Sequence, residues 1–247
     1  MLTGKRTCIT GGASGLGLAI AGDIVAQGGT VFLLDRDEVA LSRARDQIGA
    51  DGVVVDVAEE TQVANAVAAA AEALGGINGL VVSAGVQLHA DDGPIGDVSL
   101  QTWERTVGVN MTGAFLTMRA AMPYLIDAGR GSVVLIGSPT GITMSGAGYA
   151  AYSASKAGMM GLARAAAADY ADRGVRTNVV VPGTMETPLT QDLVDDPATR
   201  ASLLRGTPLG RLGRPDDIVG LVSWLLSDAA GFATGGIFAV DGGLTAR

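Results

Sequence analysis

The amino-acid sequence predicts an α/β protein built on a doubly wound parallel sheet of about seven strands with helices on both faces. Short β-branched runs alternate with long alanine-rich amphipathic segments along the 247 residues. The strand-like runs are almost continuously apolar, which is typical of strands covered on both faces. Repeated strand–helix alternation is the pattern of an open parallel sheet.

The elements follow in order along the chain. Strands are expected at residues 7–10, 30–34, 52–55, 79–83, 132–136, 176–181 and 237–240. Helices are expected at residues 15–27, 38–48, 59–74, 100–128, 149–173 and 215–227. No linker, charge run or internal repeat divides the chain, so we expect a single domain over residues 1–247.

The segment 182–214 breaks this rhythm and carries four prolines, Pro182, Pro188, Pro197 and Pro208. Long connections at the carboxyl end of a strand often cover the ligand crevice of such a sheet. We therefore expect a substrate-covering lid here; a solvated surface excursion is the alternative.

Composition excludes several functions. The formal net charge is −8 and no basic cluster exceeds two adjacent residues, which disfavours binding to nucleic acid or to a membrane surface. One cysteine and one histidine allow no internal disulfide and no ordinary zinc site. The N-terminus has no signal-peptide layout and no apolar run approaches ~20 residues. We expect a cytoplasmic protein without metal.

The run from Thr10 to Gly17 lies between the first strand and the first helix. Glycines at such a junction let the backbone approach a pyrophosphate, whose charge the N-terminus of the helix stabilises. The spacing is Gly-x-x-x-Gly-x-Gly, and a tight turn without a ligand is the alternative. The expected phosphate contacts are Gly11, Ser14, Gly15, Leu16 and Gly17.

Asp35 ends the second strand, about 20 residues beyond the glycine loop, where a dinucleotide-binding fold places a ribose-binding carboxylate. A carboxylate there would repel a 2′-phosphate, which favours NAD(H) over NADP(H). Arg36 argues the other way, because an arginine can pair with a phosphate. Asp35 can also cap the next helix. Asp56 is placed to meet the adenine edge, or to cap the helix that starts near residue 59.

Tyr152 and Lys156 lie four residues apart in an expected helix, so their side chains share one face. A free tyrosine titrates near ~10, and a neighbouring positive charge favours the phenolate. The pair is therefore a candidate acid/base with its activating cation. Ser138 lies upstream, just after an expected strand, where it is a candidate partner for a substrate oxygen.

These pieces together resemble the short-chain dehydrogenase/reductase family, which implies a Rossmann-type fold. The similarity extends over essentially the whole chain. Besides the glycine loop, the matching pieces are Asp56-Val57, Ser83-Ala84-Gly85, Asn110, Ser138, Tyr152 with Lys156, Asn178, Pro182-Gly183 with Thr187, and Asp241-Gly242-Gly243.

The resemblance implies a role for each matched residue. Tyr152 would be the general acid/base, and Lys156 would lower its pKa and bind the nicotinamide ribose. Ser138 would hold the substrate oxygen, and Asn110 would hold a water that links Lys156 to solvent. The remaining expected cofactor contacts are Arg36, Asp56, Val57, Ser83, Ala84, Gly85, Tyr152, Pro182, Gly183, Met185 and Thr187.

The sequence departs from the family pattern at two points that bear on the site. Ser83 stands where many members have an asparagine, which leaves the strength of cofactor binding open. The interval from Ser138 to Tyr152 is slightly long, which can shift one wall of the pocket. The expected substrate contacts are Ser138, Met144, Tyr149, Tyr152, Met185 and Leu189.

The expected function is an NAD(H)-dependent oxidoreductase that interconverts a neutral, fairly apolar secondary alcohol and its ketone. A reductase of 3-oxoacyl thioesters, bound to a carrier protein or CoA, and a non-catalytic NAD(H)-binding sensor are the alternatives. The helices at 100–128 and 149–173 are apolar on so many faces that we expect a second subunit to cover them. The resemblance implies a homotetramer.

Overall fold

The computed structural model describes residues 2–143 and 148–246. Within these ranges, seven strands form one parallel sheet in the order β3-β2-β1-β4-β5-β6-β7. The strands are β1 (Arg6–Thr10), β2 (Thr30–Asp35), β3 (Asp51–Val54), β4 (Gly79–Val82), β5 (Gly131–Ile136), β6 (Val175–Pro182) and β7 (Ile237–Val240). Their positions confirm the predicted sheet.

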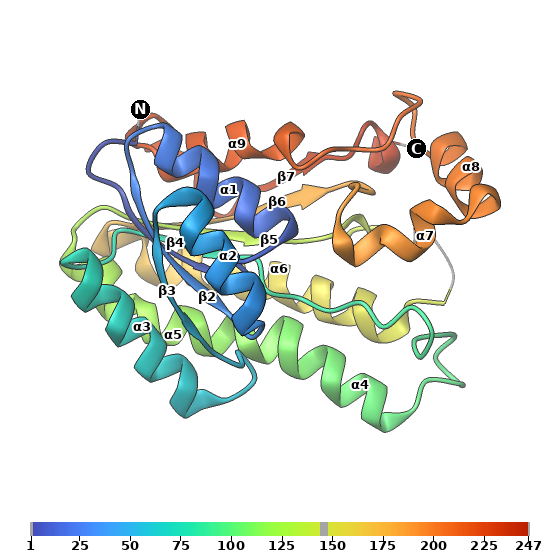
Figure 1. The fold of residues 1–247 in the computed structure, drawn as a ribbon, viewed down its shortest axis with the longest axis horizontal. Helices are drawn as coiled ribbons and strands as arrows, with labels where there is room; N and C mark the ends of the chain where they lie inside the picture. Colours follow the sequence, from blue (N-terminus) through green and yellow to red (C-terminus); the bar gives the residue numbers. More distant parts are fainter. Residues whose placement is uncertain (1, 144–147, 247) are drawn as a thin grey trace.

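Helices cover both faces of the sheet (Figure 1). The α-helices are α1 (Gly15–Ala26), α2 (Glu38–Ile48), α3 (Glu60–Leu74), α4 (Leu100–Val107), α5 (Gly113–Asp127), α6 (Ala150–Tyr170), α7 (Gln191–Asp195), α8 (Pro197–Gly206) and α9 (Asp216–Leu226). Short 3₁₀ turns occur at Pro139–Gly141, Ala171–Arg173, Pro188–Thr190, Asp228–Ala230 and Leu244–Ala246. Helices α3, α5 and α6 pack on one face, and α1, α2 and α9 pack on the other.

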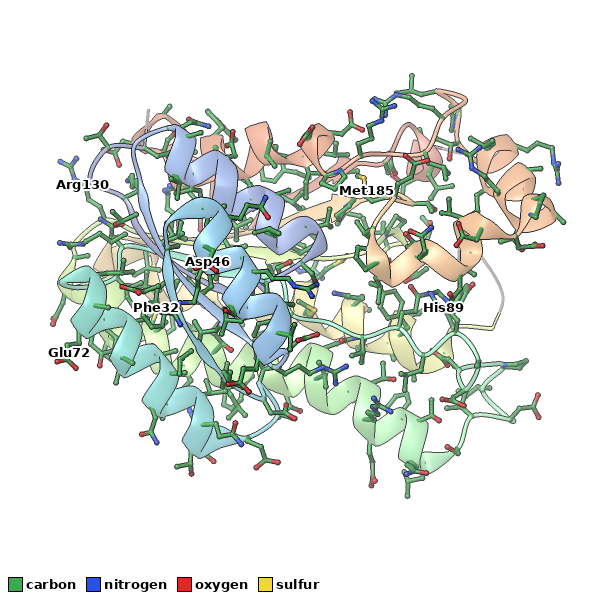
Figure 2. All side chains as sticks on the ribbon, viewed as in Figure 1. Phe32, Asp46, Glu72, His89, Arg130 and Met185 are labelled. Atoms are coloured by element: carbon green, nitrogen blue, oxygen red, sulfur yellow. The ribbon has the colours of Figure 1, made fainter. Side chains whose placement is uncertain are left out.

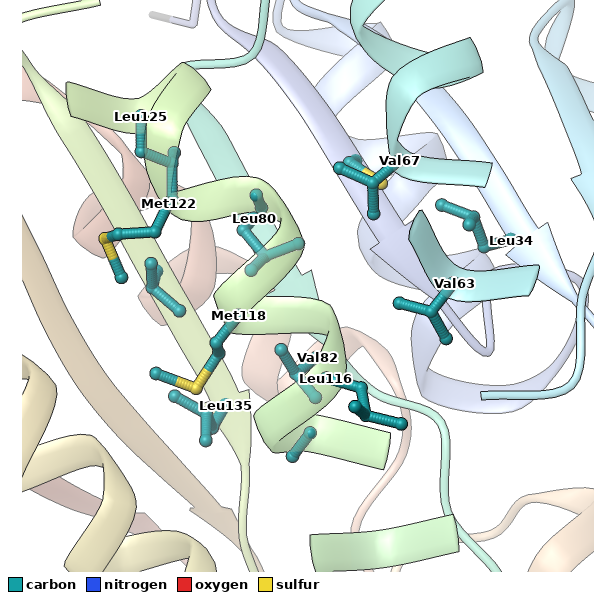
Figure 3. Close-up of a cluster of buried hydrophobic side chains, with 14 of the residues drawn as sticks. Leu34, Val63, Val67, Leu80, Val82, Leu116, Met118, Met122, Leu125 and Leu135 are labelled. Carbon is teal, nitrogen blue, oxygen red and sulfur yellow. The ribbon is translucent and has the colours of Figure 1, made fainter. Parts of the chain in front are cut away.

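The core forms two apolar layers, one on each face of the sheet. Figure 3 shows part of the first layer, where side chains of α3 and α5 meet strands β2, β4 and β5. Leu80 of β4, Leu125 of α5 and Leu135 of β5 are fully buried there. Truncating such a leucine to alanine typically costs about 2–5 kcal/mol of stability, so this layer is a main source of the fold's stability.

Two features differ from the predicted elements. The helix expected at 100–128 is divided by a π-helical turn at Gly108–Thr112, which lies between α4 and α5. The segment 182–214 contains two helices, α7 and α8, where the sequence analysis expected none. The prolines misled the prediction because Pro197 does not break α8 but starts it, at a position where a missing N–H costs nothing.

The structure gives further facts on the cysteine, on membrane-spanning helices and on metal-binding groups. Cys8, in the middle of β1, is fully buried, and burial raises the pKa of its thiol. Across residues 2–143 and 148–246, no helix combines the length and apolar character that crossing a bilayer requires. The same residues contain no group of three or more His, Cys, Asp or Glu side chains placed to hold a metal ion.

The sheet order locates the site. Strands β1 to β3 are added toward one edge of the sheet, and strands β4 to β7 are added toward the opposite edge. At such a switch point the connections diverge, and they leave a crevice at the carboxyl ends of the strands. The glycine loop after β1 and the segment after β4 flank this crevice.

Candidate active site

A cavity of about 630 Å³ opens at the carboxyl ends of the strands. Its lining includes every residue that the sequence analysis assigned to the cofactor: Gly11, Ser14, Gly15, Leu16, Gly17, Asp35, Arg36, Asp56, Val57, Ser83, Ala84, Gly85, Tyr152, Lys156, Pro182, Gly183, Met185 and Thr187. Residues from six separate segments of the chain therefore meet in one cavity, as the prediction of a dinucleotide site requires.

The loop after β1 has the features of a phosphate cradle. Ser14 precedes α1 in an extended conformation, and its side chain makes no capping hydrogen bond. The first turn of α1 carries no acidic side chain that would compete with an anion. A Cβ added to Gly17 would lie 2.0 Å from the carbonyl oxygen of Gly11. Only glycine allows this close approach, and the helix N-terminus is left open to an anion.

Asp35 binds the loop to the end of β2. Its carboxylate accepts hydrogen bonds from the backbone N–H of Ala13 at 3.0 Å and of Asp37 at 3.1 Å. The cap of α2 is Asp37, which accepts from the N–H of Ala40, so the capping alternative for Asp35 is wrong. Asp35 faces the cavity with Arg36 beside it.

Asp56 lies after β3, also at the cavity. Its carboxylate accepts from the N–H of Ala58 at 2.9 Å, which forms a tight turn before the helix. The residue at the N-cap of α3 is Glu59, so Asp56 does not cap that helix either. Ser83 starts the segment after β4 and lines the cavity next to Ala84. The backbone N–H groups of both residues donate to the Thr10 hydroxyl.

Ser138, Tyr152 and Lys156 lie together on the floor of the cavity. The Ser138 hydroxyl follows β5 and lies 3.1 Å from the hydroxyl of Thr140, whose backbone N–H donates to it at 3.4 Å. Tyr152 is only 7% exposed and Lys156 only 4%. The Lys156 ammonium lies 5.7 Å from the centroid of the Tyr152 ring and donates to the carbonyl oxygen of Ile136 at 2.9 Å.

Burial dominates the acid/base properties of this pair. It raises the pKa of Tyr152 to about 12, although the hydrogen bond with the Ser138 side chain lowers it. Burial lowers the pKa of Lys156 to about 8. The sequence analysis expected Lys156 to lower the tyrosine pKa; the net shift is a rise, and Lys156 is not among its causes. The reason is that the loss of hydration disfavours both charged forms.

Asn110 differs from the other candidates because it does not line the cavity. It lies in the π-helical turn, and its side chain is fully buried. Its amide nitrogen donates to the carbonyl oxygen of Val86 and to the Ser155 hydroxyl, both at 3.0 Å, and its oxygen accepts from the N–H of Val86 at 2.8 Å. The water relay stays a prediction, with the second lone pair of that oxygen as the remaining side-chain site for it.

The end of the cavity assigned to the substrate lies beyond Tyr152. Ser138, Tyr149, Met185 and Leu189 line it as expected, and Met144 lies outside the described residues. Figure 2 labels Met185, near the point where β6 runs into the segment with α7 and α8. Thr140, Leu203 and Leu244 also line the cavity; the sequence analysis named none of them singly, although Leu203 lies in the segment 182–214 that it expected to cover the substrate. Thr140 could have been predicted, because it lies only two residues after Ser138. No local sequence pattern indicates that Leu244 reaches the cavity.

The cavity fits a nicotinamide dinucleotide on structural grounds. Added Cβ atoms at Gly11 and Gly183 would lie 2.8 Å from Ala84 and 2.7 Å from Asp241. These glycines keep backbone close to backbone along the edge where an extended ligand would lie. The open end of α1 suits a pyrophosphate, and the carboxylate of Asp35 suits a ribose.

Comparisons with known proteins agree with this geometry. The family model described as enoyl-(acyl carrier protein) reductase matches residues 11–245. Two curated relatives are similar along nearly their whole length. One is 2-(S)-hydroxypropyl-CoM dehydrogenase 3 of Xanthobacter autotrophicus, which is 39% identical over 99% of this chain and 98% of its own. The other is 2,5-dichloro-2,5-cyclohexadiene-1,4-diol dehydrogenase of Sphingobium indicum, which is 38% identical over 98% of this chain and 96% of its own.

A solved structure gives the same result. The gluconate 5-dehydrogenase of Burkholderia cenocepacia, in complex with NADP and tartrate, superposes with a TM-score of 0.92. It is 34% identical, and the match covers 99% of this chain and 96% of that one.

Proposed function

Because this chain belongs to the short-chain dehydrogenase/reductase family, we propose that it is an NAD(H)-dependent oxidoreductase that interconverts a secondary alcohol and a ketone. Its relatives include dehydrogenases of secondary alcohols, which supports action on a CH–OH group. The observation that carries the proposal is the convergence of Ser138, Tyr152 and Lys156 on the cavity that also holds the glycine loop.

The nicotinamide, when bound, supplies the hydride in the reductive direction and accepts it in the oxidative one. The hydroxyl of Ser138 donates a hydrogen bond to the carbonyl oxygen of the substrate, since its own oxygen already accepts from the N–H of Thr140. The Tyr152 hydroxyl donates a proton to the same oxygen, and the product is the alcohol. Oxidation runs these steps backward, with Tyr152 as the proton acceptor.

The protonation states favour the two directions differently. With a pKa of about 12, the Tyr152 phenol is protonated at neutral pH and ready to donate. With a pKa of about 8, Lys156 carries its proton at neutral pH and stabilises the phenolate left after donation. Oxidation needs the phenolate before reaction, so its rate should rise with pH.

Asp35 supports NAD(H) as the cofactor. Its carboxylate faces the cavity at the position expected for the adenosine ribose, where it would repel a 2′-phosphate. The NADP bound by the Burkholderia enzyme shows that a similar fold accepts the phosphorylated cofactor. Arg36 offers the positive charge that such a phosphate would need, and the Asp35 carboxylate, held by two backbone N–H groups, opposes it.

The lining of the cavity supports a neutral and fairly apolar substrate. Among its described lining residues, the charged side chains are Asp35, Arg36, Asp37, Asp56 and Lys156. Four of the five lie at the adenosine end, and the fifth is the partner of Tyr152. We further propose one domain in which residues 182–214 cover this substrate.

A reductase of 3-oxoacyl thioesters is the second candidate, because the matching family model is described as an enoyl-(acyl carrier protein) reductase, which also acts on a carrier-bound acyl thioester. The net charge of −8 disfavours docking an acidic carrier. We propose a cytoplasmic homotetramer for either activity.

The test measures the absorbance of reduced nicotinamide with NADH or NADPH and a panel of apolar ketones, cyclic diketones and 3-oxoacyl thioesters. We expect oxidation of NADH with one class of neutral ketone. Tyr152→Phe should lower kcat by roughly 10²–10⁴-fold and change the Kd of NADH far less, because it removes the phenolic hydroxyl that transfers the proton and leaves the ring in place. Tyr170→Phe, at the far end of the same helix, is the matched control.

Turnover by Tyr152→Phe at the parental rate would contradict the mechanism. Turnover that requires NADPH would contradict the choice of cofactor. Binding of NADH without turnover on any substrate of the panel would favour the sensor.

A further inference from the structure

The helix that carries Tyr152 and Lys156 starts without a cap of its own. Its N-cap residue is Tyr149, whose side chain makes no capping hydrogen bond, and the first turn has no acidic residue. The first N–H groups of a helix have no acceptor inside the helix and require partners from elsewhere. In α6, these groups belong to Ala150, Ala151 and Tyr152.

The partners come from the connection between β4 and α4, about 60 residues earlier in the chain. One carboxylate oxygen of Asp92 accepts from the N–H of Ala151 at 3.1 Å, and the other accepts from the N–H of Tyr152 at 3.0 Å. The N–H of Ala150 donates to the carbonyl oxygen of Gly93 at 3.3 Å. Two neighbouring residues of this connection therefore accept from the N–H groups of the first three helical residues of α6.

We propose that Asp92 is a positioning residue of the reaction: its carboxylate fixes the start of α6 and thereby places the Tyr152 phenol against Ser138. This inference rests on the proposed function. A carboxylate is the strongest acceptor for N–H groups at a helix start, because it also interacts favourably with the helix dipole. The bond to the backbone of Tyr152 fixes the position of that residue directly. Displacements of about 1 Å at a reacting group cost about 10²-fold in rate.

The connection that carries Asp92 is itself held at several points. The side chain of Asn110 accepts from the backbone N–H of Val86 and donates to the backbone carbonyl oxygen of Val86. It also donates to the hydroxyl of Ser155 in α6. The Asp92 carboxylate accepts from the N–H of Gly93 at 3.0 Å, which orients the carboxylate toward the helix. The ring atom Nε2 of His89, a residue labelled in Figure 2, lies 3.3 Å from the carbonyl oxygen of Leu189 in the segment beyond β6. Asp92 is therefore presented by an anchored segment.

The variant that tests the proposal is Asp92→Asn. An amide of nearly the same shape keeps one oxygen acceptor, so either the N–H of Tyr152 or that of Ala151 then faces an NH₂ group. Asp91→Asn is the matched control, because Asp91 carries the same charge, is adjacent and is exposed. We expect Asp92→Asn to lower kcat by about tenfold or more with the Kd of NADH and the melting temperature within error of the parent, since the displacement is local. The control should retain parental kcat.

Amide hydrogen exchange on the protein without ligand gives a readout that does not depend on turnover. In the parent, the N–H groups of Ala151 and Tyr152 should be protected, although the first turn of a helix normally exchanges quickly. In Asp92→Asn, at least one of them should exchange at least tenfold faster. If that variant does not fold, the exchange rates of these two amides in the parent still test whether Asp92 holds the start of α6.

Unprotected amides at Ala151 and Tyr152 in the parent would overturn the proposal, as would a parental kcat in Asp92→Asn. A parallel loss of NADH affinity and melting temperature would also overturn it, because it would indicate a general structural role. Failure of the proposed function is distinguishable: the parent would then lack turnover with every substrate, whatever the exchange at α6.

Discussion

The ammonium group of Lys156 lies in the interior, between the ring of Tyr152 and the carbonyl oxygen of Ile136. Its pKa falls from 10.5 to about 8 on folding, because burial disfavours the charged form. Between these two values the unfolded chain holds a proton that the folded chain has lost. Stability rises with pH where the unfolded state binds more protons, so this residue makes the free energy of unfolding increase from about pH 8 to 10.5.

Lys156→Met removes that contribution. The free energy of unfolding of the variant minus that of the parent should therefore be largest below pH 8 and should decrease toward pH 10.5. Urea denaturation of both proteins across this window measures the difference. The pKa of Tyr152 rises on folding from 10.0 to about 12, so its own contribution falls mostly above this window. A difference that stays constant with pH would contradict the buried ammonium.

Asp35 gives a prediction about cofactor choice. Asp35→Ser removes the charge that opposes a 2′-phosphate and leaves Arg36 to attract it. The ratio of NADPH to NADH affinity should rise by about tenfold or more, or about 1.4 kcal/mol, as measured from the two Kd values. Asp46→Ser removes the same charge from an exposed position of α2 and should leave the ratio unchanged. An unaltered ratio in Asp35→Ser would show that another group discriminates.

At the scale of elements, the segment 182–214 shows how local capping overrides a proline-rich composition. Asp196 accepts from the N–H of Thr199 at 2.7 Å and is followed by Pro197 at the first helical position. Aspartate before proline is a typical helix start. The sequence analysis treated the prolines as breaks, and so it missed a start signal that was present in the sequence.

Asp196→Ala should loosen α8, because the first turn loses its side-chain acceptor. We expect faster proteolysis within residues 197–206 and a higher KM for the substrate, with an unchanged midpoint of global unfolding. Limited proteolysis with mass spectrometry locates the cleavage. Asp195→Ala is the control, since Asp195 does not cap α8 but accepts from the side chain of Gln191. Equal cleavage of both variants would contradict this role of the cap.

The predicted strands are confirmed because buried parallel strands have a strong local signature of continuous apolar runs. The pair Tyr152 and Lys156 was equally visible, since helical spacing alone places both residues on one face. The π-helical turn that holds Asn110 was not visible, because it adds one residue to a turn inside an otherwise regular pattern. The contact from Asp92 to α6 joins segments 60 residues apart, and no local pattern reports it.

At the scale of the whole molecule, the apolar surface of α4 to α6 supports the proposed homotetramer. Trp103 of α4 is 39% exposed and Phe115 of α5 is 43% exposed. The outer face of α6 presents small side chains at helical spacing, including Ala154, Ala157 and Gly161, which allow a second helix to approach closely. The two methionines of α6, Met159 and Met160, are buried within the chain itself.

Light scattering after gel filtration should give the mass of four chains of 24.8 kDa each. Phe115→Glu places a charge on the exposed face of α5 and should lower the measured mass to that of a dimer or a monomer. Val39→Glu, on the exposed side of α2, is the control and should remain tetrameric. A monomeric parent would contradict the assembly.

The interior position of Cys8 has a practical consequence for labelling. The chain has one thiol, which is enclosed by the sheet and whose pKa burial raises, so little of it is thiolate at neutral pH. A cysteine introduced at an exposed site on α8 would therefore be the reactive position in the folded protein, with no need to remove the native one. A spectroscopic probe attached there would report the movement of residues 197–206 as ligands bind.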